Sequence, residues 1–129
     1  MKRIAPCTLV ILLLLSAAAA KTQKRQTNPC ENAPSQYEAN QCAHKEYEAA
    51  DAELNKVYNQ LASKLDDAEQ RAQLKSAELA WIKYRDSTCV FESSQYKGGT
   101  MRGMIESFCL TRVTKARAAE LKEQYELRR

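Results

Sequence analysis

Three charged side chains in this sequence could support catalysis if they meet in the folded protein. Asp51 lies in one predicted helix, and Arg85 and Asp86 are neighbours in the next. If the two helices are antiparallel, Arg85 falls within one turn of Asp51, and its guanidinium can bind a carboxylate through two hydrogen bonds. A catalytic carboxylate pair is the alternative, but no glycine-rich phosphate loop, activated nucleophile or metal-ligand set accompanies these residues. We therefore predict an ion pair that joins two helices.

His44 is the only histidine, and the chemistry that histidine supports needs partners. A hydrolytic triad requires a nucleophile and an orienting carboxylate, and a zinc site requires several ligands. The helix predicted around His44 does not supply them, so we predict an ordinary helix residue. The sequence thus predicts no catalytic residue, no metal site and no cofactor, and we expect that the protein is not an enzyme.

Five cysteines are present, and Cys7 lies in a segment that we expect to be removed. The remaining four, Cys30, Cys42, Cys89 and Cys109, form an even set in an exported chain, which indicates two disulfides. Four cysteines allow three pairings, among which the sequence does not choose. We favour the two local closures, Cys30–Cys42 and Cys89–Cys109, each of which would stabilise the fold by about 3 kcal/mol. A zinc site is disfavoured because no two cysteines have the close spacing of zinc ligands.

Residues 1–20 have the pattern of a secretory signal peptide. A basic start at Lys2-Arg3 precedes an apolar run over 8–15, and small residues end the segment at Ala20. The apolar run is too short to span a bilayer, and Cys7 precedes it, whereas a lipidated cysteine would follow it. We therefore predict cleavage after Ala20, no membrane anchor, and a periplasmic or secreted location.

The length and net charge of the chain limit the number of domains and the kinds of partner that it can bind. The 129 residues suffice for one domain. The formal net charge is +4 at pH 7, and it falls to +2 without residues 1–20, which hold two of the 20 basic residues and none of the 16 acidic ones. A nearly neutral mature chain lacks the positive field that general nucleic-acid binding requires. We therefore predict a small exported domain that does not bind nucleic acid.

The chain after the leader divides into an irregular tail and a helical domain. Residues 21–35 contain two prolines and few large apolar side chains, which predicts an irregular tail. Ser35 and Glu38 then have the spacing of a capping box, and the helical domain is predicted over 36–129. Apolar residues of the first helix recur at steps of three and four. They are Tyr47, Ala50, Leu54, Val57, Leu61 and Leu65.

A second helix is predicted to start after Asp66 and Asp67, either of which can cap it. Its apolar residues again recur at steps of three and four. They are Leu74, Ala77, Trp81, Tyr84, Thr88 and Phe91. We expect this stripe, including its aromatic side chains, to face the core.

The segment 95–100 ends the second helix because it contains the only adjacent glycines in the chain. Thr100 is the expected N-cap of a third helix. No segment alternates convincingly with the period of two that a half-buried strand requires. Similar helix lengths and short connections predict an all-α fold, an antiparallel bundle of about three long helices with two disulfides.

This connectivity gathers several features at one end of the bundle. The start of the first helix, the end of the second and the start of the third meet there, and three of the four mature cysteines lie towards the same end. The connection between the second and third helices combines an aromatic residue, a cation and small residues, and it is either a recognition loop or only a helix connection. We predict a partner-binding surface there. Its residues are Tyr96, Lys97, Gly98, Gly99 and Thr100.

Several short motifs follow one another at characteristic spacings. They are Asp51-x-x-Leu54-Asn55-x-x-Tyr58, Trp81-x-x-Tyr84-Arg85-Asp86-x-x-Cys89, Gly98-Gly99, and Thr114-x-x-Arg117 followed by Leu121. With the four cysteines, this pattern resembles the LprI-like lysozyme-inhibitor family of small exported bacterial proteins. The resemblance covers about residues 30–122, and the family's lipid-anchor sequence is absent from this chain.

The resemblance implies an all-helical, disulfide-bonded domain outside the cytoplasm, and at least one family member is associated with lysozyme inhibition. The motif residues suit packing and bonding between helices, so we expect them to be structural. The leading hypothesis is an exported bacterial binding protein that occludes lysozyme and protects the cell wall. The alternative is an envelope structural or partner-binding module without lysozyme contact. The expected partner is therefore lysozyme or another envelope protein.

Overall fold

The computed structural model describes residues 29–128, which form three long α-helices. They are α1 (Gln36–Ser63), α2 (Ala68–Ser93) and α3 (Arg102–Glu126), with the short 3-10 helix η1 (Ser94–Tyr96) after α2. No strand occurs within 29–128, so the predicted all-α fold is confirmed. The predicted signal peptide and most of the predicted tail lie outside the described residues. Among the residues described, no helix is long and apolar enough to cross a membrane.

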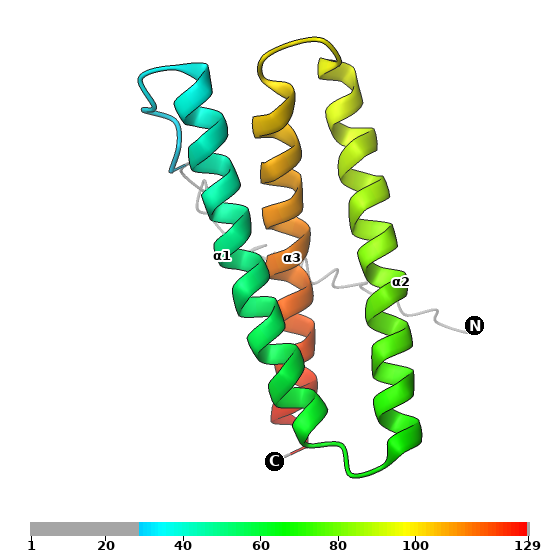
Figure 1. The fold of residues 1–129 in the computed structure, drawn as a ribbon. Helices are drawn as coiled ribbons and strands as arrows, with labels where there is room; N and C mark the ends of the chain where they lie inside the picture. Colours follow the sequence, from blue (N-terminus) through cyan, green and yellow to red (C-terminus); the bar gives the residue numbers. More distant parts are fainter. Residues whose placement is uncertain (1–28, 129) are drawn as a thin grey trace, which may run out of the picture.

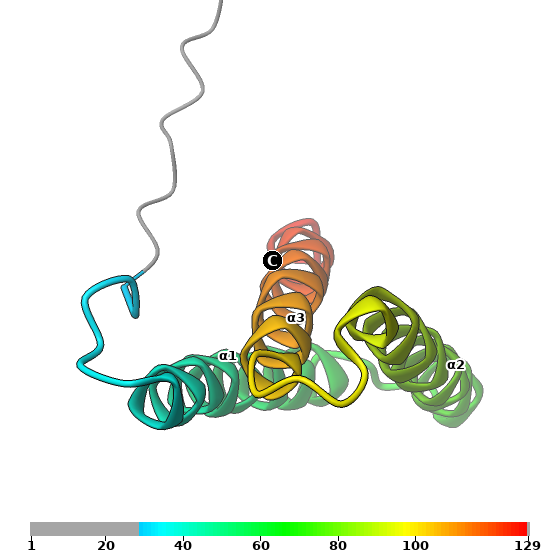
Figure 2. The same cartoon turned by 90° about the horizontal axis from the view of Figure 1, so that it is seen from above.

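α3 lies between the other two helices and packs against both (Figure 1). α1 and α3 run in the same direction, and α2 runs against them. The upper ends of α1 and α2 lie on opposite sides of α3 when the bundle is seen from above (Figure 2). We call this end the turn pole; it comprises the start of α1, residues 94–101 and the start of α3. Because α2 packs mainly on α3, it has only one helix neighbour along much of its length.

Side chains cap the first two helices as the sequence predicts. The Ser35 hydroxyl accepts a hydrogen bond from the Glu38 backbone N–H at 3.2 Å, and an Asp67 carboxylate oxygen accepts one from Glu69 at 3.0 Å. The prediction for α3 was wrong, because this helix begins after Met101 without a side-chain cap. Met101 occupies the N-cap position and the helix begins at Arg102, one residue later than a Thr100 cap requires.

The apolar core fills mainly the half of the bundle away from the turn pole. Its buried members come from α1, the connection that follows it, the start of α2, and α3. They are Leu54, Val57, Leu61, Leu65, Leu74, Ala118 and Leu121. Cys89, Cys109 and Val113 form a second, smaller cluster nearer the turn pole, and Trp81 packs against both clusters. Trp81 thus connects the two parts of the core.

The prediction that the apolar stripe of α2 faces the core was wrong for three of its members. Ala77 is exposed, Tyr84 is 60% exposed and Phe91 is 79% exposed. The buried positions of α2 include Arg85 and Cys89 instead, each one or two residues away on a different face of the helix. A helix with one neighbour buries a narrow face, which leaves the adjoining apolar positions in solvent.

Candidate functional site

Trp81 of α2 has two guanidinium groups close to its indole ring. The guanidinium carbons of Arg85 and Arg117 lie 5.2 Å and 5.9 Å from the centre of its indole ring. Arg85 also lies 5.5 Å from the ring of Tyr47 on α1. Aromatic rings and cations at these distances attract each other. The series Tyr47–Arg85–Trp81–Arg117 therefore ties all three helices together.

Arg85 is buried and contacts two carboxylates. Its Nη1 lies 3.3 Å from Asp51 on α1, and its Nε donates to the neighbouring Asp86 at 2.8 Å. The contact with Asp51 agrees with the sequence analysis, but the guanidinium divides its bonds between two carboxylates and does not hold one through two bonds. Burial alone would lower the pKa of Arg85, yet the hydrogen bond to Asp86 and the nearby negative charges raise it above its usual value. Arg85 is thus a fixed cation.

Tyr47 and Asn55 complete the surroundings of this cation on α1. Burial raises the pKa of the Tyr47 phenol above 10.0; Arg85 opposes that rise, and Asp51 and Asp86 add to it. Asn55 donates to both the backbone carbonyl and the carboxylate of Asp51, at 2.9 Å and 3.0 Å. Asn55 therefore orients the carboxylate that faces Arg85.

Arg117 of α3 makes the most buried ion pair described, and its partner was missed from the sequence. Its Nε and Nη2 both donate to one carboxylate oxygen of Glu78 on α2 at 3.0 Å, and Nη1 donates to Glu120 at 3.1 Å. The side chains of Arg117 and Glu78 are only 13% and 12% exposed. Glu78 lies seven residues before Arg85, hence on the same face of α2, and that spacing could have identified it.

The other motif residues divide between core and surface. Leu54 is buried and Tyr58 is half-buried against the core, whereas Tyr84 is exposed. His44 is exposed and lies 3.4 Å from Glu48 one turn later. Within residues 29–128, no group of His, Cys, Asp and Glu side chains has the arrangement of a metal site.

Both predicted disulfides are present. Cys30 is bonded to Cys42, which fastens the segment before α1 to its second turn. Cys89 is bonded to Cys109, which joins the end of α2 to the start of α3 and encloses the turn between them. The predicted pairing of cysteines that are close in the sequence is therefore confirmed.

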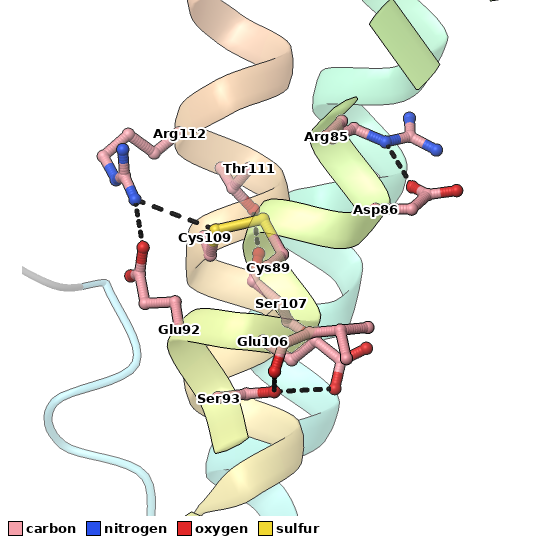
Figure 3. The surroundings of a disulfide bond; sticks show 11 residues. Arg85, Asp86, Cys89, Glu92, Ser93, Glu106, Ser107, Cys109, Thr111 and Arg112 are labelled. Atoms are coloured by element: carbon pink, nitrogen blue, oxygen red, sulfur yellow. Dashed lines mark hydrogen bonds and ion pairs between the residues drawn. A yellow bond between two sulfur atoms is a disulfide. The ribbon is translucent and has the colours of Figure 1, made fainter. Parts of the chain in front are cut away.

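Two polar bridges flank the Cys89–Cys109 disulfide (Figure 3). Arg112 of α3 donates to Glu92 of α2 at 2.6 Å, and the Ser93 hydroxyl lies 3.2 Å from a carboxylate oxygen of Glu106. Ser93 is fully buried, whereas the Glu106 side chain is 34% exposed, so the second bridge is shielded from water on the Ser93 side. A covalent bond and two polar bridges therefore fix the helix ends on either side of the turn.

The turn itself is held by backbone bonds. The Lys97 N–H donates to Ser94 at 3.1 Å, and the Gly99 N–H donates to Tyr96 at 3.0 Å. Gly98 has a positive φ of 82°, a conformation that costs glycine nothing and strains other residues. Asn40 of α1 donates to the Thr100 carbonyl at 3.0 Å, which ties the turn to a second helix. Tyr96 is half-buried, and the other four residues of the predicted surface are exposed.

Comparison with known proteins agrees with the fold and with the resemblance to the LprI-like family. The family described as "Lysozyme inhibitor LprI" matches residues 27–121. "Uncharacterized protein R02472" of Rhizobium meliloti (strain 1021) is 38% identical over 127 residues, which cover 89% of this chain and 91% of the relative. The crystal structure of a DUF1311 family protein from Pseudomonas putida superposes with a TM-score of 0.63 at 22% identity, covering 67% of this chain and 90% of that one, and it therefore shares the fold. The chain belongs to the LprI lysozyme inhibitor family.

Proposed function

We propose that this protein is exported, binds lysozyme and inhibits it, and so protects the bacterial cell wall. Family membership supports an inhibitor-like role. The proposed contact surface is the turn Tyr96–Thr100. The observation that carries this choice is the fixed geometry around the turn, with the Cys89–Cys109 disulfide on its flanks and Asn40 bonded to Thr100. A surface that is already ordered loses little conformational entropy when it binds.

The charges at the turn suit a carboxylate-lined cleft. Lysozyme cleaves its substrate with a pair of carboxyl groups in its cleft. Lys97 is exposed at the tip of the turn, and Arg102 follows at the start of α3. The mature chain is nearly neutral, so attraction to lysozyme would come from this local patch and not from the whole molecule.

The proposal is tested by measuring how the exported protein slows the clearing of a bacterial cell suspension by lysozyme. Replacing Tyr96 and Lys97 with alanine is expected to weaken inhibition by at least about tenfold, or about 1.4 kcal/mol of binding free energy. Lys83→Ala with Tyr84→Ala is the matched control, because this pair has the same residue types, is exposed and lies on α2 away from the turn. The control should inhibit as well as the wild type.

Two results would contradict the proposal in different ways. If the wild-type protein inhibits and the Tyr96/Lys97 variant inhibits equally, the contact surface lies elsewhere on the molecule. If the wild-type protein does not slow lysozyme at all, the alternative of an envelope module without lysozyme contact is favoured.

A further inference from the structure

A groove runs between α1 and α3 and is separate from the turn. Its volume is about 310 Å³. Its floor consists of small apolar residues from both helices. They are Ala49, Ala50, Val57, Ala118 and Ala119. Alanine side chains on both sides of a groove allow another helix surface to approach closely, because the distance between packed helices depends on the side chains at the contact.

The two edges of this groove carry opposite charges. Glu46 and Glu53 form the edge on α1, and Lys115 and Lys122 form the edge on α3. Glu46 and Lys115 lie at the same height, meaning the same position along the direction of the two helices, since their charged atoms are 3.8 Å apart. α1 and α3 run in the same direction, and each second charge follows the first by seven residues, about 10.5 Å along a helix. Glu53 and Lys122 therefore also lie at matching heights.

We propose that this groove is a self-association surface, on which a second copy of the chain docks face to face. A two-fold axis parallel to the helices places the acidic edge of one copy over the basic edge of the other without changing their heights. Glu46 then faces Lys115 of the second copy, and Glu53 faces Lys122. A two-fold axis across the helices would oppose like charges, which disfavours the antiparallel arrangement. The placement of the charges on the two edges therefore favours a dimer in which the two copies are parallel.

The charged side chains are available for such contacts. Glu53 and Lys122 are exposed, and Lys115 is 59% exposed despite its long contact with Glu46. Glu53 bonds only to the neighbouring Lys56 among the ion pairs described. Ala49 and Ala119 are exposed at the margins of the floor, so docking would remove apolar surface from water.

This arrangement places both turn poles at the same end of the pair. It uses α1 and α3 and leaves Tyr96–Thr100 uncovered, so it stands whether or not the turn binds lysozyme. If the turn does bind, a pair would present two copies of it side by side, which raises the effective concentration of the second contact.

Charge reversal on each edge tests the proposal by sedimentation of the exported protein over a range of concentrations. The wild type is expected to form dimers that weaken as salt is added. Glu46→Lys with Glu53→Lys makes both edges basic, and Lys115→Glu with Lys122→Glu makes both edges acidic. Each variant alone should dimerise at least about tenfold more weakly. An equimolar mixture of the two should recover association, because every contact across the mixed pair is again between opposite charges.

Lys75→Glu with Lys83→Glu is the control for Lys115→Glu with Lys122→Glu, since it makes the same change of net charge on exposed positions of α2. This control should dimerise like the wild type, and circular dichroism should show that every variant is folded. A wild type that remains monomeric at about 1 mM overturns the proposal, because a dimer with a Kd near that value would be detected. Dimerisation unaffected by either reversal, or a mixture that stays monomeric, overturns it equally.

Discussion

Arg85 is the residue on which the contacts between α1 and α2 converge. It reaches Asp51, Asp86 and the rings of Tyr47 and Trp81. The Arg85 side chain is only 10% exposed, whereas the side chains of Asp51 and Asp86 are 39% and 54% exposed. Water can therefore solvate the carboxylates if the guanidinium is removed. Removing Arg85 should therefore lower the free energy of unfolding by less than removing one partner of an ion pair in which both side chains are buried.

We expect Arg85→Ala to lower the free energy of unfolding by about 2 kcal/mol, as measured by urea denaturation. Arg85→Lys should recover only part of this, because an ammonium keeps the charge without the planar group that stacks on Trp81. His44→Ala is the control, since that side chain is exposed and its described contacts are limited to Glu48 and the ring of Tyr47, 6.3 Å away between centroids. Unchanged stability of Arg85→Ala with loss of lysozyme inhibition would instead identify Arg85 as a functional residue.

Thr114 carries a buried hydroxyl without a hydrogen-bond partner among the described residues. Its side chain is fully buried in α3. Because an unpaired polar atom loses its bonds to water on folding, Thr114→Val should raise the free energy of unfolding by about 1 kcal/mol. Thermal and urea unfolding of the two proteins would measure this. Thr111→Val is the comparison that should not be stabilised, because the Thr111 hydroxyl donates to the Ser107 carbonyl at 2.8 Å.

At the scale of the elements, the hairpin of α2 and α3 depends on the Cys89–Cys109 disulfide. Replacing both cysteines with serine should lower the free energy of unfolding by about 2–5 kcal/mol. Hydrogen exchange at residues 94–101 should accelerate in the same variant, because the covalent restraint on the turn is lost. Free thiols or a bound zinc ion in the native wild-type protein would contradict the disulfide on which this prediction depends.

The exposed aromatics of α2 follow from the arrangement of the helices. α2 packs mainly on α3, and its buried positions include a guanidinium and a disulfide as well as apolar groups. Tyr84 and Phe91 lie on an adjoining face that none of the three described helices covers. An apolar residue at helical spacing is therefore not sufficient to predict burial when the helix has one neighbour.

At the scale of the whole molecule, the signal peptide is a prediction that can be checked directly. The mature protein is expected to begin at Lys21, because the small residues ending at Ala20 have the pattern of a cleavage site. Intact mass measured on exported protein would decide this. A mass that includes residue 1, or a mass increased by a lipid, would contradict the expected processing.

The sequence by itself determined the properties that depend on near neighbours in the chain. Helical periodicity predicted three helices, Ser35 and Asp67 supplied the caps, and short separations favoured the observed cysteine pairs. The bridge from Arg85 to Asp51 was also predictable, because counting residues from the connection near Asp67 fixes the register of an antiparallel pair.

Only the tertiary structure decided how each helix is rotated and which neighbour covers it. Periodicity identifies a stripe on α2, but a rotation of the helix by a fraction of a turn exchanges Tyr84 for Arg85 at the contact. That same rotation selects Glu78 as the partner of Arg117 from among the acidic residues of α2. The groove between α1 and α3 likewise exists only because two helices separated by α2 in the chain lie parallel in space, which depends on packing energies that no local pattern contains.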